Sequence, residues 1–198
     1  MLKKDIQSLF RAIRKHDSDV VTRMLRDQPE LVRATAVSPP KKDDGQSPLQ
    51  VAFKTGNLSA ASLLLDLGAD VGFQEQSTVN SWTAPVLHDA IRAASFSDDA
   101  VGAARLVERV LALGADPNCV DSYGNSALHR ALMDARILTS GLPDFPCVIS
   151  RQDVRLRLEH LFGILRRAGA DPDRGTPTRE SPRQSFAGEV ALAALLDA

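Results

Sequence analysis

Apolar residues recur at three- and four-residue intervals through most of the chain, which indicates amphipathic helices rather than strands. Three of these apolar segments end in the same way, with Gly-Ala-Asp at residues 68–70, 114–116 and 169–171. A glycine at a helix end can adopt the left-handed conformation without the steric penalty of a Cβ atom. The pattern therefore predicts an all-α fold in which each of these glycines closes a helix.

A second shared element has residue types that suit the start of a helix. It reads Ser-Pro-Leu-Gln at residues 47–50, Pro-Val-Leu-His at 85–88 and Ser-Ala-Leu-His at 126–129. A serine side chain caps the first turn of a helix, and a proline fits its first position. The chain therefore alternates between helices that open with this element and helices that end with Gly-Ala-Asp.

The two elements together resemble the ankyrin repeat, with its Thr-Pro-Leu-His-x-Ala signature and its period of about 33 residues. The resemblance implies an ankyrin-repeat solenoid of stacked helix-turn-helix units with β-turn fingers. Leu49 stands 19 residues before Gly68, which is the spacing of the family, whereas 27 residues separate Leu87 from Gly114. Leu128 and Gly169 are 41 residues apart, so these two later units carry about eight and about twenty-two additional residues.

The resemblance, which is to bacterial-type members with about five repeats, predicts a single domain over residues 1–198. We expect an N-terminal capping repeat at about 1–34, central repeats at 43–73, 81–120 and 121–174, and a C-terminal cap at 175–198. The additional residues should form insertions at about 95–101 and 138–153, between inner and outer helices. The terminal units are degenerate because each needs one polar face.

Charge, cysteine content and the length of apolar runs argue against several classes of protein. The net charge of −1 gives no general attraction to nucleic acid or to anionic membranes. Cys119 and Cys147 are too few and too far apart for a disulfide framework or a zinc site, which favours a reduced, cytoplasmic location. No apolar run is long enough for a signal peptide or a membrane span. We expect a chain without cofactor or metal, monomeric when free, with neither nucleic acid nor membrane as partner.

His88 and His129 are the residues that most invite a catalytic or metal-binding interpretation. The resemblance implies a structural role instead, in which this histidine hydrogen-bonds the backbone near the fingers. Gln50 occupies the same position, and an amide can also hydrogen-bond there. No phosphate-binding loop or known catalytic motif is present, so catalysis is not expected. The remaining motif positions, expected to be structural, are Pro48, Leu49, Gly68, Leu87, Gly114, Leu128 and Gly169.

Trp82 and Tyr123 are the only Trp and Tyr, and each stands five residues before the Leu of its unit. The two therefore occupy the same place in consecutive repeats. Such aromatic residues dominate the binding energy of protein interfaces. We predict that Trp82 and Tyr123 lie side by side on neighbouring fingers and form part of a partner-binding ridge, with Asp44 one finger earlier. For Trp82, folding back onto its own finger stays open; for Tyr123, exposure is favoured.

Three further segments bear on partner binding. The apolar insertion around Phe145 is expected to be an ordered loop that covers part of the stack, which makes Phe145 another candidate contact. Residues 35–44 should form a polar, mobile first finger. The C-terminal third is locally basic, and either a solvated helix face or a docking patch for an acidic partner explains this. Its arginines are Arg151, Arg155, Arg157, Arg166, Arg167, Arg174, Arg179 and Arg183.

These observations favour a non-catalytic scaffold that binds and inhibits or regulates another protein. The most concrete form is a cytoplasmic immunity protein that neutralises a bacterial toxin or effector, because the chain is similar to small ankyrin proteins with that role. A regulatory or host-directed adaptor would have the same repeats. An enzyme is the remaining class, and no converging acids, histidines or cysteines support it.

Overall fold

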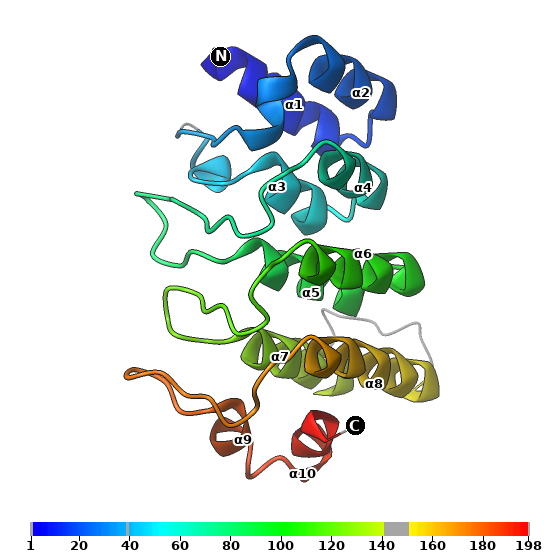
Figure 1. Cartoon of the computed structure of the whole chain (residues 1–198), viewed down its shortest axis with the longest axis vertical. Helices are drawn as coiled ribbons and strands as arrows, with labels where there is room; N and C mark the ends of the chain where they lie inside the picture. The colour runs from blue at the N-terminus through cyan, green and yellow to red at the C-terminus, as the bar shows by residue number, and fades with distance from the viewer. Residues whose placement is uncertain (1, 39, 141–150, 198) are drawn as a thin grey trace.

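The computed structural model describes residues 2–38, 40–140 and 151–197, which are mainly helical and contain no strand. Helices come in antiparallel pairs that follow one another along the long axis from the N-terminus to the C-terminus (Figure 1). The helices are α1 (Lys3–Arg14), α2 (Ser18–Asp27), α3 (Pro48–Lys54), α4 (Leu58–Asp66), α5 (Val86–Phe96), α6 (Ala100–Ala112), α7 (Ala127–Ser140), α8 (Arg151–Arg167), α9 (Pro182–Ser185) and α10 (Val190–Ala193). Short 3₁₀ helices are η1 (Pro29–Arg33), η2 (Lys41–Asp43) and η3 (Ala194–Leu196).

From α1 to α9, each helix packs on its counterparts in the neighbouring pairs. The first members contact one another in the order α1, α3, α5, α7 and α9, and the second members in the order α2, α4, α6 and α8. Alanines that are wholly buried on the first members, Ala52, Ala90 and Ala131, let these helices approach closely. Larger side chains such as Phe53 on α3 and Phe162 on α8 are buried as well. The result is one apolar core that runs the length of the chain.

In the first three pairs, the second helix begins at a residue whose side chain caps it. Asp17, Asn57 and Asp99 each accept a hydrogen bond from the amide three residues later, at 3.1, 3.0 and 2.8 Å. The amide nitrogen of the Asn57 side chain also donates to the carbonyl of Ile13 at 2.9 Å. One residue therefore starts α4 and ties it to the preceding pair.

The Gly-Ala-Asp segments close α4, α6 and α8. Gly68, Gly114 and Gly169 have φ values of 80°, 102° and 91°, the conformation that the sequence pattern indicates. In the first of these ends, the amide of Gly68 donates to Leu65 O and that of Ala69 to Leu64 O, at 3.1 and 2.9 Å. This is a Schellman motif, which satisfies carbonyls that the helix end would leave free.

The additional residues of the third unit do not form the loop expected at about 95–101. Helix α5 has 11 residues against 7 in α3, and α6 has 13 against 9 in α4, so each helix is four residues longer. Four residues are about one helical turn. The prediction of an inserted loop was therefore wrong here: both helices gain a turn, and the connection between them stays short. Helices α7 and α8, with 14 and 17 residues, are longer still.

Four loops join the second helix of one pair, or η1, to the first helix of the next. We call them finger 1 (residues 34–47), finger 2 (67–85), finger 3 (113–126) and finger 4 (168–181). They lie along one side of the molecule (Figure 1). Isolated antiparallel bridges fasten the last three, at Gln74–Pro85, Val120–Ser126 and Thr176–Arg179.

Candidate protein-binding site

Fingers 2 and 3 are joined through the side chains of Trp82 and Asp121. The indole Nε1 of Trp82 donates to Oδ2 of Asp121 at 2.8 Å. Asp121 is buried, and its other oxygen accepts from the amides of Tyr123 and Asn125, both at 2.9 Å. Burial raises the pKa of Asp121, but the hydrogen bonds from Asn125 and Trp82 hold it below its ordinary value. The carboxylate is thus a fixed, ionised centre between the two fingers.

Backbone contacts reinforce this junction. The amide of Ser122 donates to the carbonyl of Thr83, and the amide of Thr83 donates to the hydroxyl of Ser122, both at 3.0 Å. The Ser122 hydroxyl also reaches the carbonyl of Ser81 at 3.2 Å. Because both fingers hold each other, their tips form one surface rather than two independent loops.

Trp82 and Tyr123 meet solvent to different extents. Trp82 is half-buried against finger 3, so it folds neither onto its own finger nor fully outward. Tyr123 exposes 55% of its surface, and its hydroxyl donates to Oγ of Ser81 at 3.3 Å. The structure therefore brings both aromatic residues to the junction of fingers 2 and 3 and leaves Tyr123 as the exposed one.

Asp44 does not belong to an exposed ridge. It is only 4% exposed, and its carboxylate accepts from Ser38 N at 2.7 Å, Ser77 Oγ at 2.8 Å and Thr78 N at 3.0 Å. Hydrogen bonds from Ser38 and Ser77 hold the pKa of Asp44 below its ordinary value. The prediction that Asp44 offers its side chain to a partner was therefore wrong, because finger 2 occupies it.

The same contacts tie down the finger that was expected to be mobile. The carbonyl of Gly45 accepts from the amide of Gln76 at 2.8 Å. Finger 1 is also closed on itself, since Ala36 exchanges hydrogen bonds with Gln46 and Gly45. Asp43 in η2 pairs with Arg14 at the end of α1. Finger 1 is therefore anchored both to finger 2 and to the first helix pair.

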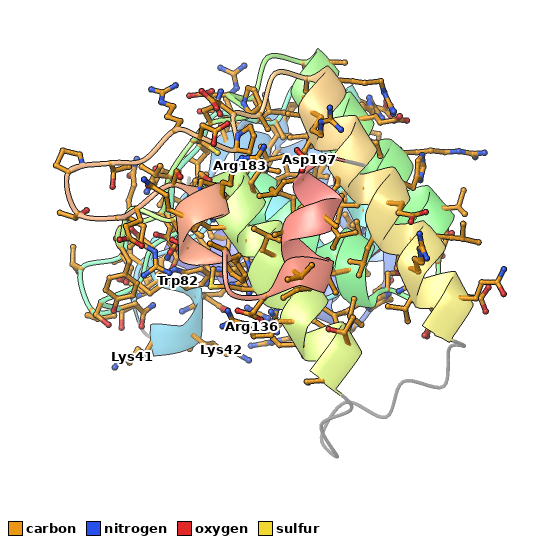
Figure 2. All side chains as sticks on the ribbon, turned by 90° about the horizontal axis from the view of Figure 1, so that it is seen from below. Lys41, Lys42, Trp82, Arg136, Arg183 and Asp197 are labelled. Carbon is orange, nitrogen blue, oxygen red and sulfur yellow. The ribbon has the colours of Figure 1, made fainter. Side chains whose placement is uncertain are left out.

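A cationic hollow of about 480 Å³ opens between fingers 1 and 2. Sequence reasoning did not single it out, although the run Pro39-Pro40-Lys41-Lys42 was visible. Figure 2 shows Lys41 and Lys42 at the same edge as Trp82. Its lining residues are Lys41, Lys42, Gln46, Lys54, Glu75, Val79, Asn80, Ser81 and Trp82.

Phe145, the fourth predicted contact, lies outside the described residues, as do Cys147 and residues 141–150 of the predicted insertion at 138–153. Its role stays a prediction.

Comparison with known proteins identifies the unit that contains α3 and α4. The family model described as "Ankyrin repeat" matches residues 44–75, which include Pro48, Leu49 and Gly68. Residues 44–75 are an ankyrin repeat, and this match supports the interpretation of the chain as an ankyrin-repeat protein. The curated proteins contain no match to it. Ankyrin repeats are generally non-catalytic modules for binding other proteins, so a protein–protein interaction scaffold is the function class of this chain.

Two histidines of this ankyrin-repeat protein occupy the motif position and are buried. Nε2 of His88 lies 3.4 Å from the carbonyl of Cys119 in finger 3, a contact that supports a structural role. Nδ1 of His129 accepts from the amide of Ser126 at 3.1 Å. Nδ1 of His88 has no hydrogen-bond partner among the described residues, because Pro85 stands where Ser126 stands in the next unit and has no amide hydrogen. Burial lowers the pKa of both imidazoles to about 4.

Gln50 fills the same position in the matched repeat and closes a capping box with Ser47. Its side-chain amide donates to Ala84 O at 2.9 Å and to Asp89 Oδ2 at 3.1 Å. Gln184 repeats the capping box with Ser181 at the start of α9. At this position of the repeat, an amide side chain and an imidazole side chain both form hydrogen bonds with the backbone.

Buried acids lie beneath cations on the first helices. Asp134 of α7 is wholly buried and pairs with Arg92 at 2.9 Å and Arg130 at 2.6 Å. Lys54 pairs with Glu75 at 2.9 Å and approaches Asp89 to 3.8 Å. Burial raises the pKa of Asp134, and raises that of Asp89 to about 7. These pairs are satisfied within the protein, and they hold neighbouring helices together.

The C-terminal arginines are also largely engaged. Arg155 pairs with Glu159 at 2.7 Å, Arg167 with Glu108 at 3.4 Å, and Arg183 with both Asp173 and Asp197. Figure 2 shows the Arg183–Asp197 pair at the C-terminal end of the array. These contacts favour a solvated, self-neutralised face over a docking patch in this third of the chain.

Three other kinds of feature were sought among the described residues: a reactive cysteine, a metal site and a membrane-spanning helix. Burial raises the pKa of the Cys119 thiol to about 12, so it is a poor nucleophile. Within residues 2–38, 40–140 and 151–197, no three His, Cys, Asp or Glu side chains cluster as metal ligands would. In the same residues, no helix is both long and apolar enough to cross a membrane.

Proposed function

We propose that this chain is a stoichiometric binding protein whose partner docks on the joined tips of fingers 2 and 3, with Tyr123 as the central contact and Trp82 beside it. The observation that carries this proposal is the exposure of Tyr123 on a tip that the Trp82–Asp121 hydrogen bond fixes. A large aromatic side chain on a fixed backbone loses little conformational entropy when it is buried by a partner.

We also propose the arrangement that gives this surface its shape. The chain is one solenoid over residues 1–198, with capping units at about 1–34 and 175–198 and central repeats at 43–73, 81–120 and 121–174. The succession of α1, α3, α5, α7 and α9 supports it, as do the four fingers on one side (Figure 1).

The finer role we propose is that of a cytoplasmic bacterial immunity protein, monomeric when free, which neutralises a toxin or effector. Its support is the resemblance of the chain to small ankyrin proteins of that kind. In this role the fixed finger surface would cover the toxin's active cleft, and the inhibitor would need neither cofactor nor turnover.

The test is protection against the product of the neighbouring reading frame. That product is expressed alone and together with this chain, and growth is measured. Growth arrest that the chain relieves supports the immunity role. A toxic product that the chain fails to neutralise overturns it. A harmless product that nevertheless binds the chain with micromolar or better affinity also overturns immunity and points to an adaptor.

Variants then locate the docking surface. Tyr123→Ala should weaken the complex by about 2 kcal/mol, as expected of an interface hot spot, and Trp82→Phe by less. Leu156→Ala is the matched control, because Leu156 is as exposed as Tyr123 but lies on α8. Affinity that changes by less than about 0.5 kcal/mol for alanine at both 82 and 123 would place the interface elsewhere.

A further inference from the structure

Lys41 and Lys42 stand next to each other in the sequence and both line the hollow between fingers 1 and 2. Both are exposed and adjacent in η2, and neither has an ion pair with any residue that the structure describes. Arg14, at the end of α1, already pairs with Asp43, the residue that follows Lys42. Two neighbouring ammonium groups without counter-ions are therefore available to a ligand that carries negative charge.

The hollow beside them holds its remaining charges in fixed pairs. Lys54 forms the floor, with its side chain 22% exposed and its ammonium 2.9 Å from the buried carboxylate of Glu75. Asp89, also buried, lies 3.8 Å from the same ammonium. Because the side chains of Glu75 and Asp89 are each only 2% exposed and lie beside the Lys54 ammonium, Lys41 and Lys42 contribute most of the charge that faces solvent in the hollow.

Trp82 supplies the wall on the side of finger 2. Its ring centroid lies 5.8 Å from Nζ of Lys54, and its Nε1 is held by Asp121, so the ring cannot turn freely. Gln46 on the opposite side is buried, and its Oε1 accepts no hydrogen bond from the described residues. The hollow therefore offers two cations without ion pairs among the described residues and an aromatic wall, and the buried Gln46 is part of its lining.

We infer that this hollow binds an acidic polypeptide segment of the partner protein, with side-chain carboxylates on Lys41 and Lys42 and aliphatic groups against Trp82. The inference rests on the proposed protein-binding function and names the chemistry of the partner. Complementary charge of this kind increases the association rate and fixes the register of the complex.

A polypeptide fits these features better than a nucleic acid does. Nucleic-acid binding usually neutralises about 6–10 phosphates along an extended basic surface. Here two unpaired lysines sit at one hollow, and the neighbouring basic side chains of the first helices, Arg92 and Arg130, are committed to Asp134. A single-stranded oligonucleotide is therefore the competitor that the experiment has to include.

Trp82 provides the measurement, because it is the only tryptophan of the chain and lines the hollow. The full chain is titrated with a capped decapeptide of alternating glutamate and alanine while tryptophan fluorescence is followed. We expect saturable binding that weakens as NaCl is raised from about 0.05 to about 0.3 M. The same peptide with glutamine in place of glutamate should not bind.

Paired charge-neutralising variants locate the contact. Lys41→Gln with Lys42→Gln should weaken binding of the glutamate peptide about tenfold. Arg23→Gln with Arg105→Gln removes the same formal charge from exposed positions on α2 and α6 and should leave binding unchanged. Equal weakening by both pairs, no saturable binding, or tighter binding of single-stranded DNA than of the peptide would each overturn the inference. Circular dichroism confirms that each variant is folded.

The partner itself separates this inference from the proposed function. If Tyr123→Ala abolishes the complex while the Lys41 and Lys42 variants bind the partner as tightly as the unaltered chain, the hollow is not used and the finger interface stands. If the lysine variants weaken the complex but Tyr123→Ala does not, the hollow is supported and the finger 2–3 interface fails.

Discussion

Trp82 and Asp121 are 39 residues apart in the sequence, yet the indole nitrogen of one donates a 2.8 Å hydrogen bond to the carboxylate of the other. Asp121 also receives the amides of Tyr123 and Asn125, so one carboxylate organises its own finger and holds the previous one. Charge-assisted hydrogen bonds of this kind are among the stronger ones in proteins. The rigidity of the candidate docking surface therefore depends on this pair.

Substitution of Trp82 and of Asp121 should lower the free energy of unfolding by different amounts. Trp82→Phe deletes one donor and should lower the free energy of unfolding by about 1–2 kcal/mol. Asp121→Ala also strands the amides of Tyr123 and Asn125 and should cost about 3 kcal/mol. Tyr123→Phe, which loses only an exposed hydroxyl contact, should cost less than about 0.5 kcal/mol. Urea unfolding measures all three, and equal losses would contradict the central position of Asp121.

Pro85→Ser should give Nδ1 of His88 the hydrogen-bond partner that it lacks among the described residues. Pro85 has φ −69° and ψ 154°, close to the φ −61° and ψ 157° of Ser181, so a serine fits without strain. Its amide and hydroxyl should then bond Nδ1 of His88, as Ser126 bonds His129. We expect Pro85→Ser to be more stable than Pro85→Ala by about 1 kcal/mol.

The alanine variant is the proper reference, because it also loses the rigidity of proline and supplies an amide without a hydroxyl. Thermal unfolding compares the two variants. A serine variant no more stable than the alanine variant would show that the hydroxyl finds no partner at His88.

Gly45 and Gly68 should respond very differently to alanine, although their φ values are +75° and +80°. A Cβ at position 45 would lie 2.0 Å from the amide nitrogen of Ser77, whereas a Cβ at position 68 would meet nothing within 4 Å. Gly68→Ala should therefore lower the free energy of unfolding by about 1–2 kcal/mol, which is the penalty for a residue with a Cβ in the left-handed conformation. Gly45→Ala should cost at least twice as much, because fingers 1 and 2 must separate. Chemical denaturation of both variants decides, and similar losses would contradict the close approach.

Acidification should act on this protein through buried groups of opposite sign: His88 and His129, whose pKa values are lowered to about 4, and Asp89, whose pKa is raised to about 7. The pKa of His88 is lowered to about 4, so the unfolded chain takes up a proton between pH 6.5 and 4 that the folded chain does not. Its contribution to stability is therefore lost as the pH falls through that range. The pKa of Asp89 is raised to about 7, so the folded chain holds a proton there, and this contribution is lost as the pH rises. Each group changes the free energy of unfolding by at most about 1.4 kcal/mol per pH unit.

Two variants separate these contributions. Asp89→Asn should lose stability more steeply than the unaltered chain when the pH falls from 6.5 to 4, because the opposing slope is gone. His88→Gln should lose it less steeply. Urea midpoints at half-unit pH intervals provide the measurement. Parallel curves for all three proteins would show that neither group titrates differently on folding.

Local patterns predicted the local features well. The sequence correctly placed three glycines at helix ends, Gly68, Gly114 and Gly169. The positive φ that ends each helix is a property of the glycine's own backbone and does not depend on a neighbouring unit. The capping box of Ser181 and Gln184 has the same spacing as that of Ser47 and Gln50, so the Ser-x-x-Gln pattern could have placed α9 in register as well.

Features that depend on a neighbouring unit could not be predicted in this way. Asp44 was expected to be exposed, but Ser77 and Thr78 of the next finger cover it. A count of additional residues fixes the length of an insertion without saying whether it forms loop or helix, which is why the extra turns of α5 and α6 were missed. For Trp82 the register was informative, yet its bond to Asp121 depends on how two fingers meet.

The order of contacts along α1, α3, α5, α7 and α9 has a mechanical consequence. Tension applied between the two ends of the chain passes through the helix pairs in series, so every junction carries the same load and the weakest one yields first. Helices α9 and α10 have four residues each, whereas α7 contributes the buried Asp134 and its two arginines. In a stretching experiment the C-terminal cap should therefore peel away at low force, and the centre of the array should unravel last.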